Sequence, residues 1–187
     1  MGGSGIGIVA MRRLMKFLHT MGAIGLMGAM ASLVVMLGVV PPPSSALAGY
    51  ALMRGAMAAV ATWVFLPSLA LMLVAGLLAI ALNRAFQNAG WAWVKLATGV
   101  LMFEYGFVGV QGPMQLEADR AAQALLGRVD PSTLALSLGA ERGTLWVLLA
   151  ISTLNVVLGV WRPRIMRRPQ SPGEAVPQRV GTGSAPR

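Results

Sequence analysis

The chain has 187 residues, of which 56% are hydrophobic and only 11% are charged. A soluble domain carries about 25% charged residues, so the composition excludes an ordinary soluble fold and indicates a membrane protein. The absence of cysteine excludes disulfides, thiolate metal sites and a cysteine nucleophile. The net charge of +9 does not indicate nucleic-acid binding, because the basic residues cluster beside apolar segments, as expected for residues that orient membrane spans.

Four segments are apolar and long enough to cross a bilayer, which takes about 20 residues in a helix. We expect spans at about residues 17–40, 56–82, 91–110 and 144–161, and we expect Pro67 to kink the second of them. The sequence therefore predicts an all-α fold, a four-helix transmembrane bundle that occupies residues 17–161.

Basic residues beside the spans set the orientation of the bundle. A basic N-terminal segment, residues 1–16, precedes the first span, Arg84 lies between the second and third spans, and residues 162–187 form a basic tail. These segments belong to one side of the membrane, so we expect both termini in the cytoplasm. The tail is rich in Pro, Gly, Ser and Arg, so we expect it to be disordered and to contact anionic lipid headgroups.

The N-terminal region has an alternative interpretation as a signal peptide that is cleaved near Ala46-Leu47-Ala48. Its apolar stretch is about 20 residues long, however, whereas a signal peptide has an apolar core of roughly 7–15 residues. The length favours an uncleaved first helix.

The outer loop between the third and fourth spans, residues 111–143, contains signals for short helices. Met114 to Leu126 is expected to form one of them on the outer surface. Asp130-Pro131-Ser132 is a typical helix start, with Asp as the N-cap and Pro at the first helical position, and Gly139 is expected to end this second helix.

Ionisable side chains inside a membrane span are costly, so they are candidate functional residues. The spans contain His19, which is the only histidine of the chain, together with Lys95 and Glu104. At 1.5 Å per residue, His19 and Lys95 both lie within about 3–6 Å of the cytoplasmic boundary and are expected to face each other. Glu104 is about 13.5 Å deeper than Lys95 and on the opposite helix face. We expect it to be neutral or to meet Arg54 on the outer side.

The first span also carries glycines at a spacing of three residues, namely Gly22, Gly25 and Gly28. Small residues let another helix, or a flat cofactor, approach the backbone closely. Ordinary helix packing is the simpler of these two explanations.

Several short motifs resemble a superfamily of small bacterial membrane proteins that includes the HemJ-type protoporphyrinogen oxidases and the CopD copper-resistance domain. The resemblance covers about residues 11–110 and is closest to uncharacterised four-helix members of that group. The motifs are Lys16-Phe17-Leu18-His19 with Gly22 and Gly28, Pro67 with Gly76, and Trp91-Ala92-Trp93-Val94-Lys95-Leu96. A fourth motif, Val160-Trp161-Arg162-Pro163, resembles only the uncharacterised members.

This resemblance implies a site and a location. In HemJ-type proteins the matching histidine and lysine are the expected haem-binding pair, so His19 and Lys95 are candidate ligands of haem b, with His19 bound to the iron. The tryptophan that follows the histidine in HemJ-type proteins is absent here, where Gly25, Leu26 and Met27 stand. The resemblance also implies a multi-pass protein of the bacterial inner membrane.

Three functions remain open at this point. The first is haem binding with a role in electron transfer or porphyrin chemistry, and an enzyme of this kind would be a HemJ-like membrane oxidoreductase. The second, which needs no catalysis, is a subunit or scaffold of a larger membrane complex that binds a membrane-protein partner or a second copy of the chain. The third is a transporter of a metal or a small solute. A non-enzymatic role is preferred, and nucleic acid is not expected as a partner.

Overall fold

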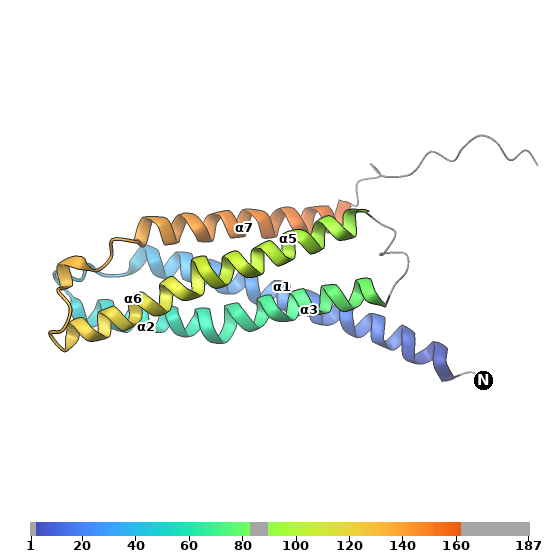
Figure 1. Ribbon diagram of the computed structural model, residues 1–187, viewed down its shortest axis with the longest axis horizontal. Helices are drawn as coiled ribbons and strands as arrows, with labels where there is room; N and C mark the ends of the chain where they lie inside the picture. The colour runs from blue at the N-terminus through green and yellow to red at the C-terminus, as the bar shows by residue number, and fades with distance from the viewer. Residues whose placement is uncertain (1–2, 83–89, 162–187) are drawn as a thin grey trace, which may run out of the picture.

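The computed structural model describes residues 3–82 and 90–161, and these residues form helices without any strand. Four stretches are long and apolar enough to cross a membrane, so the predicted all-α fold with four spans is confirmed (Figure 1). The predicted basic tail, residues 162–187, and Arg84 lie outside the described residues.

The helices form four long rods. The first rod is α1 (Gly3–Val39), so the basic N-terminal segment from residue 3 on is helical and continuous with the first span. The second and third rods each contain a π-helical segment between two α-helices. The elements that follow α1 are α2 (Leu47–Val60), η1 (Ala61–Phe65), α3 (Leu66–Ala81), α5 (Gly90–Gly106), η2 (Phe107–Gln111), α6 (Gly112–Leu125), the 3-10 helix η3 (Pro131–Thr133) and α7 (Leu138–Trp161).

Each π-helical segment lies just before a proline. Pro67 follows η1 and Pro113 follows η2, at the beginning of α3 and α6. A proline has no N–H and crowds the preceding turn, and a wider turn accommodates this without ending the helix. The irregularity that we expected at Pro67 therefore takes the form of a π-helical segment. η1 and η2 contact each other across the bundle.

The third rod is longer than expected. The predicted helix from Met114 to Leu126 is present as α6, but η2 joins it to α5, so no loop begins at residue 111. From Gly90 to Leu125 this rod is about 54 Å long at 1.5 Å per residue. The hydrocarbon core of a bilayer is about 30 Å thick, so the rod exceeds the length that a span requires.

The connection from α6 to α7 contains the predicted helix start. Asp130 Oδ1 accepts a hydrogen bond from the Ser132 N–H at 2.8 Å, and this bond holds the pKa of the Asp130 carboxyl below its usual value. The helix that follows, η3, has only three residues, because buried Leu134 returns to extended backbone and Ala135 has a positive φ of 65°. The prediction that Gly139 ends this helix is wrong, since Gly139 lies in the first turn of α7.

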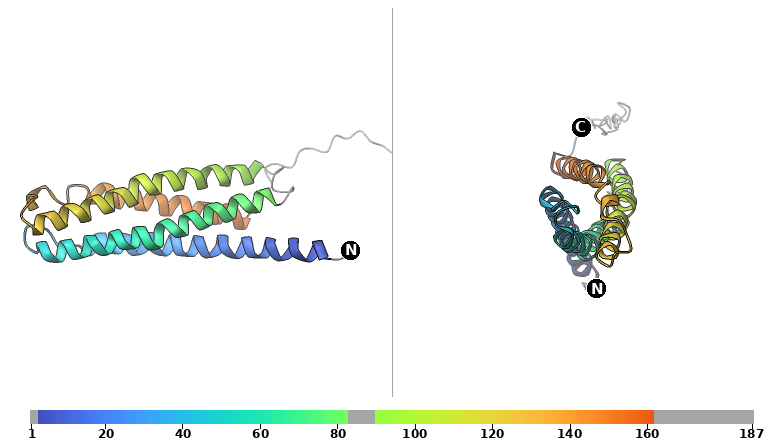
Figure 2. Two further views of the ribbon diagram at one scale, coloured as in Figure 1. Left: turned by 60° about the horizontal axis from the view of Figure 1, so that its bottom comes forward. Right: turned by 90° about the vertical axis from the view of Figure 1, so that its left-hand side faces the viewer.

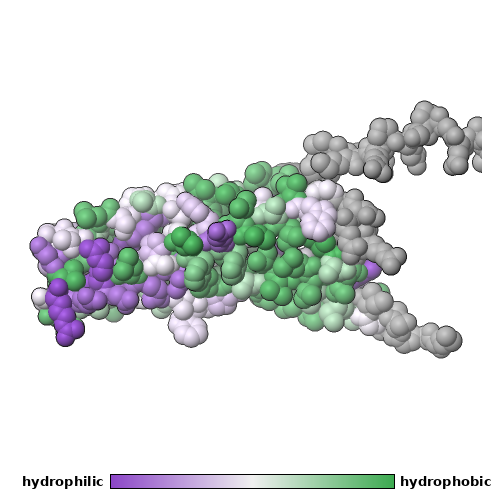
Figure 3. All heavy atoms as spheres, in the orientation of Figure 1, coloured by the Kyte–Doolittle hydropathy of each residue, from purple (hydrophilic) through white to green (hydrophobic). Residues whose placement is uncertain are grey.

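Contacts between helices define the order of the rods around the bundle. α1 packs against α3 and α7, and α5 packs against the same two helices (Figure 2). α1 and α5 therefore occupy opposite corners. Side chains of α1 such as Leu26, Met30 and Leu33 are fully buried at the centre. The surface is hydrophobic over much of the bundle and hydrophilic at the end that carries α2, α6 and η3 (Figure 3).

Candidate functional site

His19 lies half-buried on the interior face of α1, four residues after the buried Met15 and about two and three turns before the buried Leu26 and Met30. Its Nδ1 is 2.9 Å from the backbone oxygen of Met72 in α3. A carbonyl oxygen only accepts, so Nδ1 donates and Nε2 carries the lone pair of the neutral ring. Metal-binding histidines commonly have this arrangement, in which one ring nitrogen is held by a backbone carbonyl and the other is the ligand.

The glycines of α1 bring its backbone close to α3 at the same place. A Cβ atom added at Gly22 would be 2.8 Å from the backbone N of Met72 and from the backbone O of Ser68. At Gly25 it would collide with the Ser68 side chain, whereas at Gly28 nothing lies within 4 Å. Gly22 and Gly25 therefore serve helix packing, the simpler of the two explanations, and α3 occupies the space beside them.

Lys95 lies half-buried on the interior face of α5, which it shares with the buried Ala92 and Met102. It belongs to the corner of the bundle opposite His19. Among the described residues no hydrogen bond joins the two side chains. Contacts with α3 give the relative depth of His19 and Lys95. His19 lies beside Met72 and Gly76 of α3. Leu73, the residue after Met72, lies beside Gly99 of α5. His19 is therefore level with Gly99, about 6 Å or one turn away from Lys95 along the axis.

A polar cluster between α5 and α7 was not anticipated from the sequence. Thr98 Oγ1 donates to Asn155 Oδ1 at 3.1 Å, and Asn155 Nδ2 lies 3.9 Å from the sulfur of buried Met102. Ser152, one turn away, also lies 4.0 Å from this sulfur. The available signal was the helical spacing of Ser152 and Asn155 inside an apolar span, where polar residues commonly link helices. The cluster ties α5 to α7 at the level of His19.

Glu104 and Arg54 do not meet. Glu104 is exposed on the outer face of α5. The Arg54 side chain is fully buried in α2, where its guanidinium bonds both carboxylate oxygens of Glu141 at 2.6 and 3.2 Å. The expectation of a Glu104–Arg54 pair is therefore wrong, because α6 and the beginning of α7 bring Glu117 and Glu141 to the arginine instead. The Arg54–Glu117 separation is 4.0 Å.

The Arg54 network, which comprises Tyr50, Arg54, Glu117 and Glu141, is saturated with hydrogen bonds. Tyr50 donates to Glu117 at 2.6 Å and accepts from Arg54 Nε at 3.0 Å. The backbone N–H of Ala135 donates to Glu117 at 2.8 Å. Among the described residues no buried polar side-chain atom lacks a partner. The network therefore joins α2, α6 and α7 and leaves no free group for chemistry.

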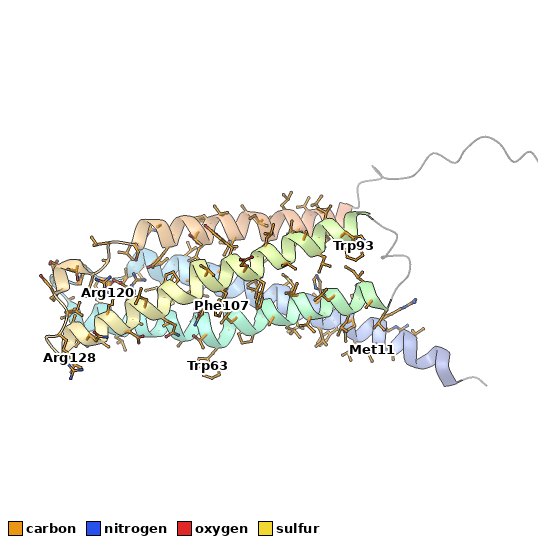
Figure 4. All side chains as sticks on the ribbon, in the orientation of Figure 1. Met11, Trp63, Trp93, Phe107, Arg120 and Arg128 are labelled. Carbon is orange, nitrogen blue, oxygen red and sulfur yellow. The ribbon has the colours of Figure 1, made fainter. Side chains whose placement is uncertain are left out.

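A cavity of about 340 Å³ lies between the C-terminal end of α3 and the beginning of α5. Its lining is apolar and consists of Leu77, Ile80, Ala81, Trp93 and Leu96. Trp93 is 52% exposed and lies close to the beginning of α5 (Figure 4). The cavity belongs to the outer surface of the helix pair and does not contain His19 or Lys95.

Metal sites built from several side chains are not found in the part of the chain that the structure describes, because no three His, Asp or Glu residues group together there. Comparison of the chain with protein-family models, with curated proteins and with solved structures finds no match. His19, which has one ring nitrogen fixed and the other available, is therefore the residue whose geometry most resembles that of a ligand.

Proposed function

We propose that the chain is a haem b-binding protein of the bacterial inner membrane, with His19 as an axial ligand of the iron. The observation that supports this is the 2.9 Å hydrogen bond from His19 Nδ1 to the Met72 carbonyl. The bond fixes the ring orientation and leaves Nε2 as a neutral nitrogen donor, as iron ligation requires.

His19 and Lys95 are the residues that would hold the haem. Both lie on interior faces, on helices at opposite corners of the bundle. Their offset along the bundle axis is about one turn, a distance comparable with the length of a lysine side chain. Lys95 would be the second ligand of the iron, through its neutral amine.

A bound haem supplies one-electron redox chemistry, and the protein supplies orientation and surroundings. The Met72 carbonyl orients the imidazole of His19. The Thr98–Asn155 hydrogen bond holds α5 against α7 one turn from Lys95 and so fixes the position of this helix. The proposed role is electron transfer or a step in porphyrin chemistry.

The first test is the haem content of the wild-type protein, purified in mild detergent from cells supplied with a haem precursor. A pyridine haemochrome spectrum is expected to show haem b at about one per chain. Protein that folds as a helical bundle by circular dichroism but has no Soret band would overturn the proposal.

A second candidate, a non-catalytic subunit or scaffold, is supported by the saturated Arg54 network. This network links three helices at one end of the bundle and leaves none of its polar groups free for chemistry, which favours a structural role. Native mass spectrometry of the complex extracted in mild detergent tests it. A stoichiometric partner subunit is expected, and a chain that is always alone would contradict this role.

A further inference from the structure

Three large aromatic side chains are exposed at one level of the bundle. Trp63 of η1, Phe107 of η2 and Trp146 of α7 are 79%, 51% and 57% exposed. η1 and η2 contact each other, and Gly109 of η2 lies next to Thr144, half a turn from Trp146. Trp63 and Phe107 lie at nearly the same place along the bundle in Figure 4. We call these three residues the aromatic girdle.

A second boundary lies near the beginning of α5. Trp93 is 52% exposed there, and Phe17 of α1 is 59% exposed. The basic residues Arg12, Arg13 and Lys16 are exposed on α1 within the five residues that precede Phe17. Aromatic residues beside basic ones are typical of the interface between a bilayer and water.

The length of the apolar part of the third rod is close to that of a bilayer. From Trp93 the rod rises about 21 Å to Phe107 of the girdle and about 27 Å to Gln111, where η2 ends, and the second value is close to the hydrocarbon thickness of about 30 Å. The exposed side chains of α5 in this interval are apolar or aromatic with one exception, Glu104. Glu104 lies one turn from Phe107 of the girdle, close enough for its carboxylate to approach the headgroups.

Beyond the girdle the third rod and the connection that follows it become more polar. α6 and the connection to α7 carry Asp119, Arg120, Arg128 and Asp130 at or near the surface. The paired π-helical segments and their prolines lie at the boundary itself, where water and headgroups are available to irregular backbone.

We propose that the hydrocarbon core of the bilayer surrounds only the part of the bundle between Trp93 and the end of η2, with the aromatic girdle near its outer edge. α2, α6, η3 and the first two turns of α7 form a helical extension in the aqueous phase, and the Arg54 network is the polar core of this extension. The girdle is the surface that binds the lipid interface. This inference does not depend on haem binding.

The test uses the absence of cysteine from the chain. Leu101→Cys and Leu116→Cys are a matched pair, because both leucines are on the same rod and are 64% and 62% exposed. Each variant is treated with a membrane-impermeant maleimide in right-side-out and in inside-out vesicles. Leu116→Cys is expected to react in one of the two preparations, and Leu101→Cys in neither.

Labelling after solubilisation in sodium dodecyl sulfate shows that both thiols are present and reactive. Equal protection of the two thiols in vesicles would mean that the hydrocarbon core covers the extension, and would overturn the inference. Labelling of Leu101→Cys in either type of vesicle would overturn it as well, since that residue would then lie in water.

Discussion

At the residue scale, His19 and Arg54 differ in how many of their side-chain nitrogens are used in hydrogen bonds within the bundle. His19 uses one ring nitrogen to bond the Met72 carbonyl and keeps the other. All three nitrogens of the Arg54 guanidinium have hydrogen-bond partners, and two of them bond the carboxylate of Glu141. Two-point contacts of this kind are among the strong charge-assisted hydrogen bonds. His19 is therefore the candidate for a role in chemistry, whereas the contacts of Arg54 hold helices together.

Lys95→Met tests the second axial ligand. Haem is expected to remain bound through His19, but the iron loses its lysine nitrogen, so the Soret band shifts and high-spin features appear in the absorption spectrum. Val94→Met is the control, because Val94 is exposed on the outer face of the same turn. A Lys95→Met spectrum identical to that of the wild type would remove Lys95 from the site.

Arg54→Met tests the Arg54 network. The substitution leaves Glu117 and Glu141 buried without their main cation, a loss that typically costs about 3–5 kcal/mol. Arg120→Met removes a half-exposed partner of Glu117 and is expected to cost only about 0–1 kcal/mol. The free energies of unfolding are compared by titration with sodium dodecyl sulfate in mixed micelles. If the two variants lost the same free energy of unfolding, the network would not stabilise the extension.

At the element scale, α1 packs closely against α3, and the geometry of this pair depends on particular glycines. Gly22 and Gly25 face Ser68 and Met72, and these contacts hold α3 where the Met72 carbonyl reaches His19. Small residues have this use in membrane bundles, where close backbone approach increases van der Waals contact.

Gly22→Ala tests this packing. The added methyl group meets the backbone of α3, which cannot rotate away as a side chain does, so the two helices must separate. Overpacking of this kind costs typically about 1–3 kcal/mol. Gly28→Ala adds the same methyl group to the same helix at a position with open space, and its melting temperature is expected to equal or exceed that of the wild type. Thermal melts in detergent give the comparison, and equal melting temperatures for the two variants would contradict the packing account.

At the scale of the whole molecule, the four spans could be predicted because each requires only a long apolar run. The continuity of α5 with α6 could not be predicted, because the apolar run ends near residue 110 and charged residues follow it, so a loop was expected from residue 111. A π-helical segment accommodates Pro113 and lets the rod continue. The partners of Arg54 could not be predicted either. Glu117 and Glu141 lie far from Arg54 in the sequence, in the segment expected to be the outer loop, and only the packing of α2 against α6 and α7 brings them together.

His19 and Lys95 were expected to face each other at one depth, whereas in the structure about one turn separates them along the axis and their helices occupy opposite corners of the bundle. The prediction counted residues from the presumed beginning of each span. In the structure α1 begins at Gly3, and its position along the bundle is set by its contacts with α3. The Thr98–Asn155 bond likewise depends on the register of α5 against α7, which one sequence does not specify.

The most direct test of the central claim, that His19 is an axial ligand, is the reduced-minus-oxidised absorption spectrum of the wild type beside that of His19→Asn. Asparagine keeps an N–H that can donate to the Met72 carbonyl but has no nitrogen donor for iron. The account predicts a haem b spectrum for the wild type and its loss in His19→Asn, with the helical content unchanged. A haem spectrum of undiminished intensity and position in His19→Asn would contradict it.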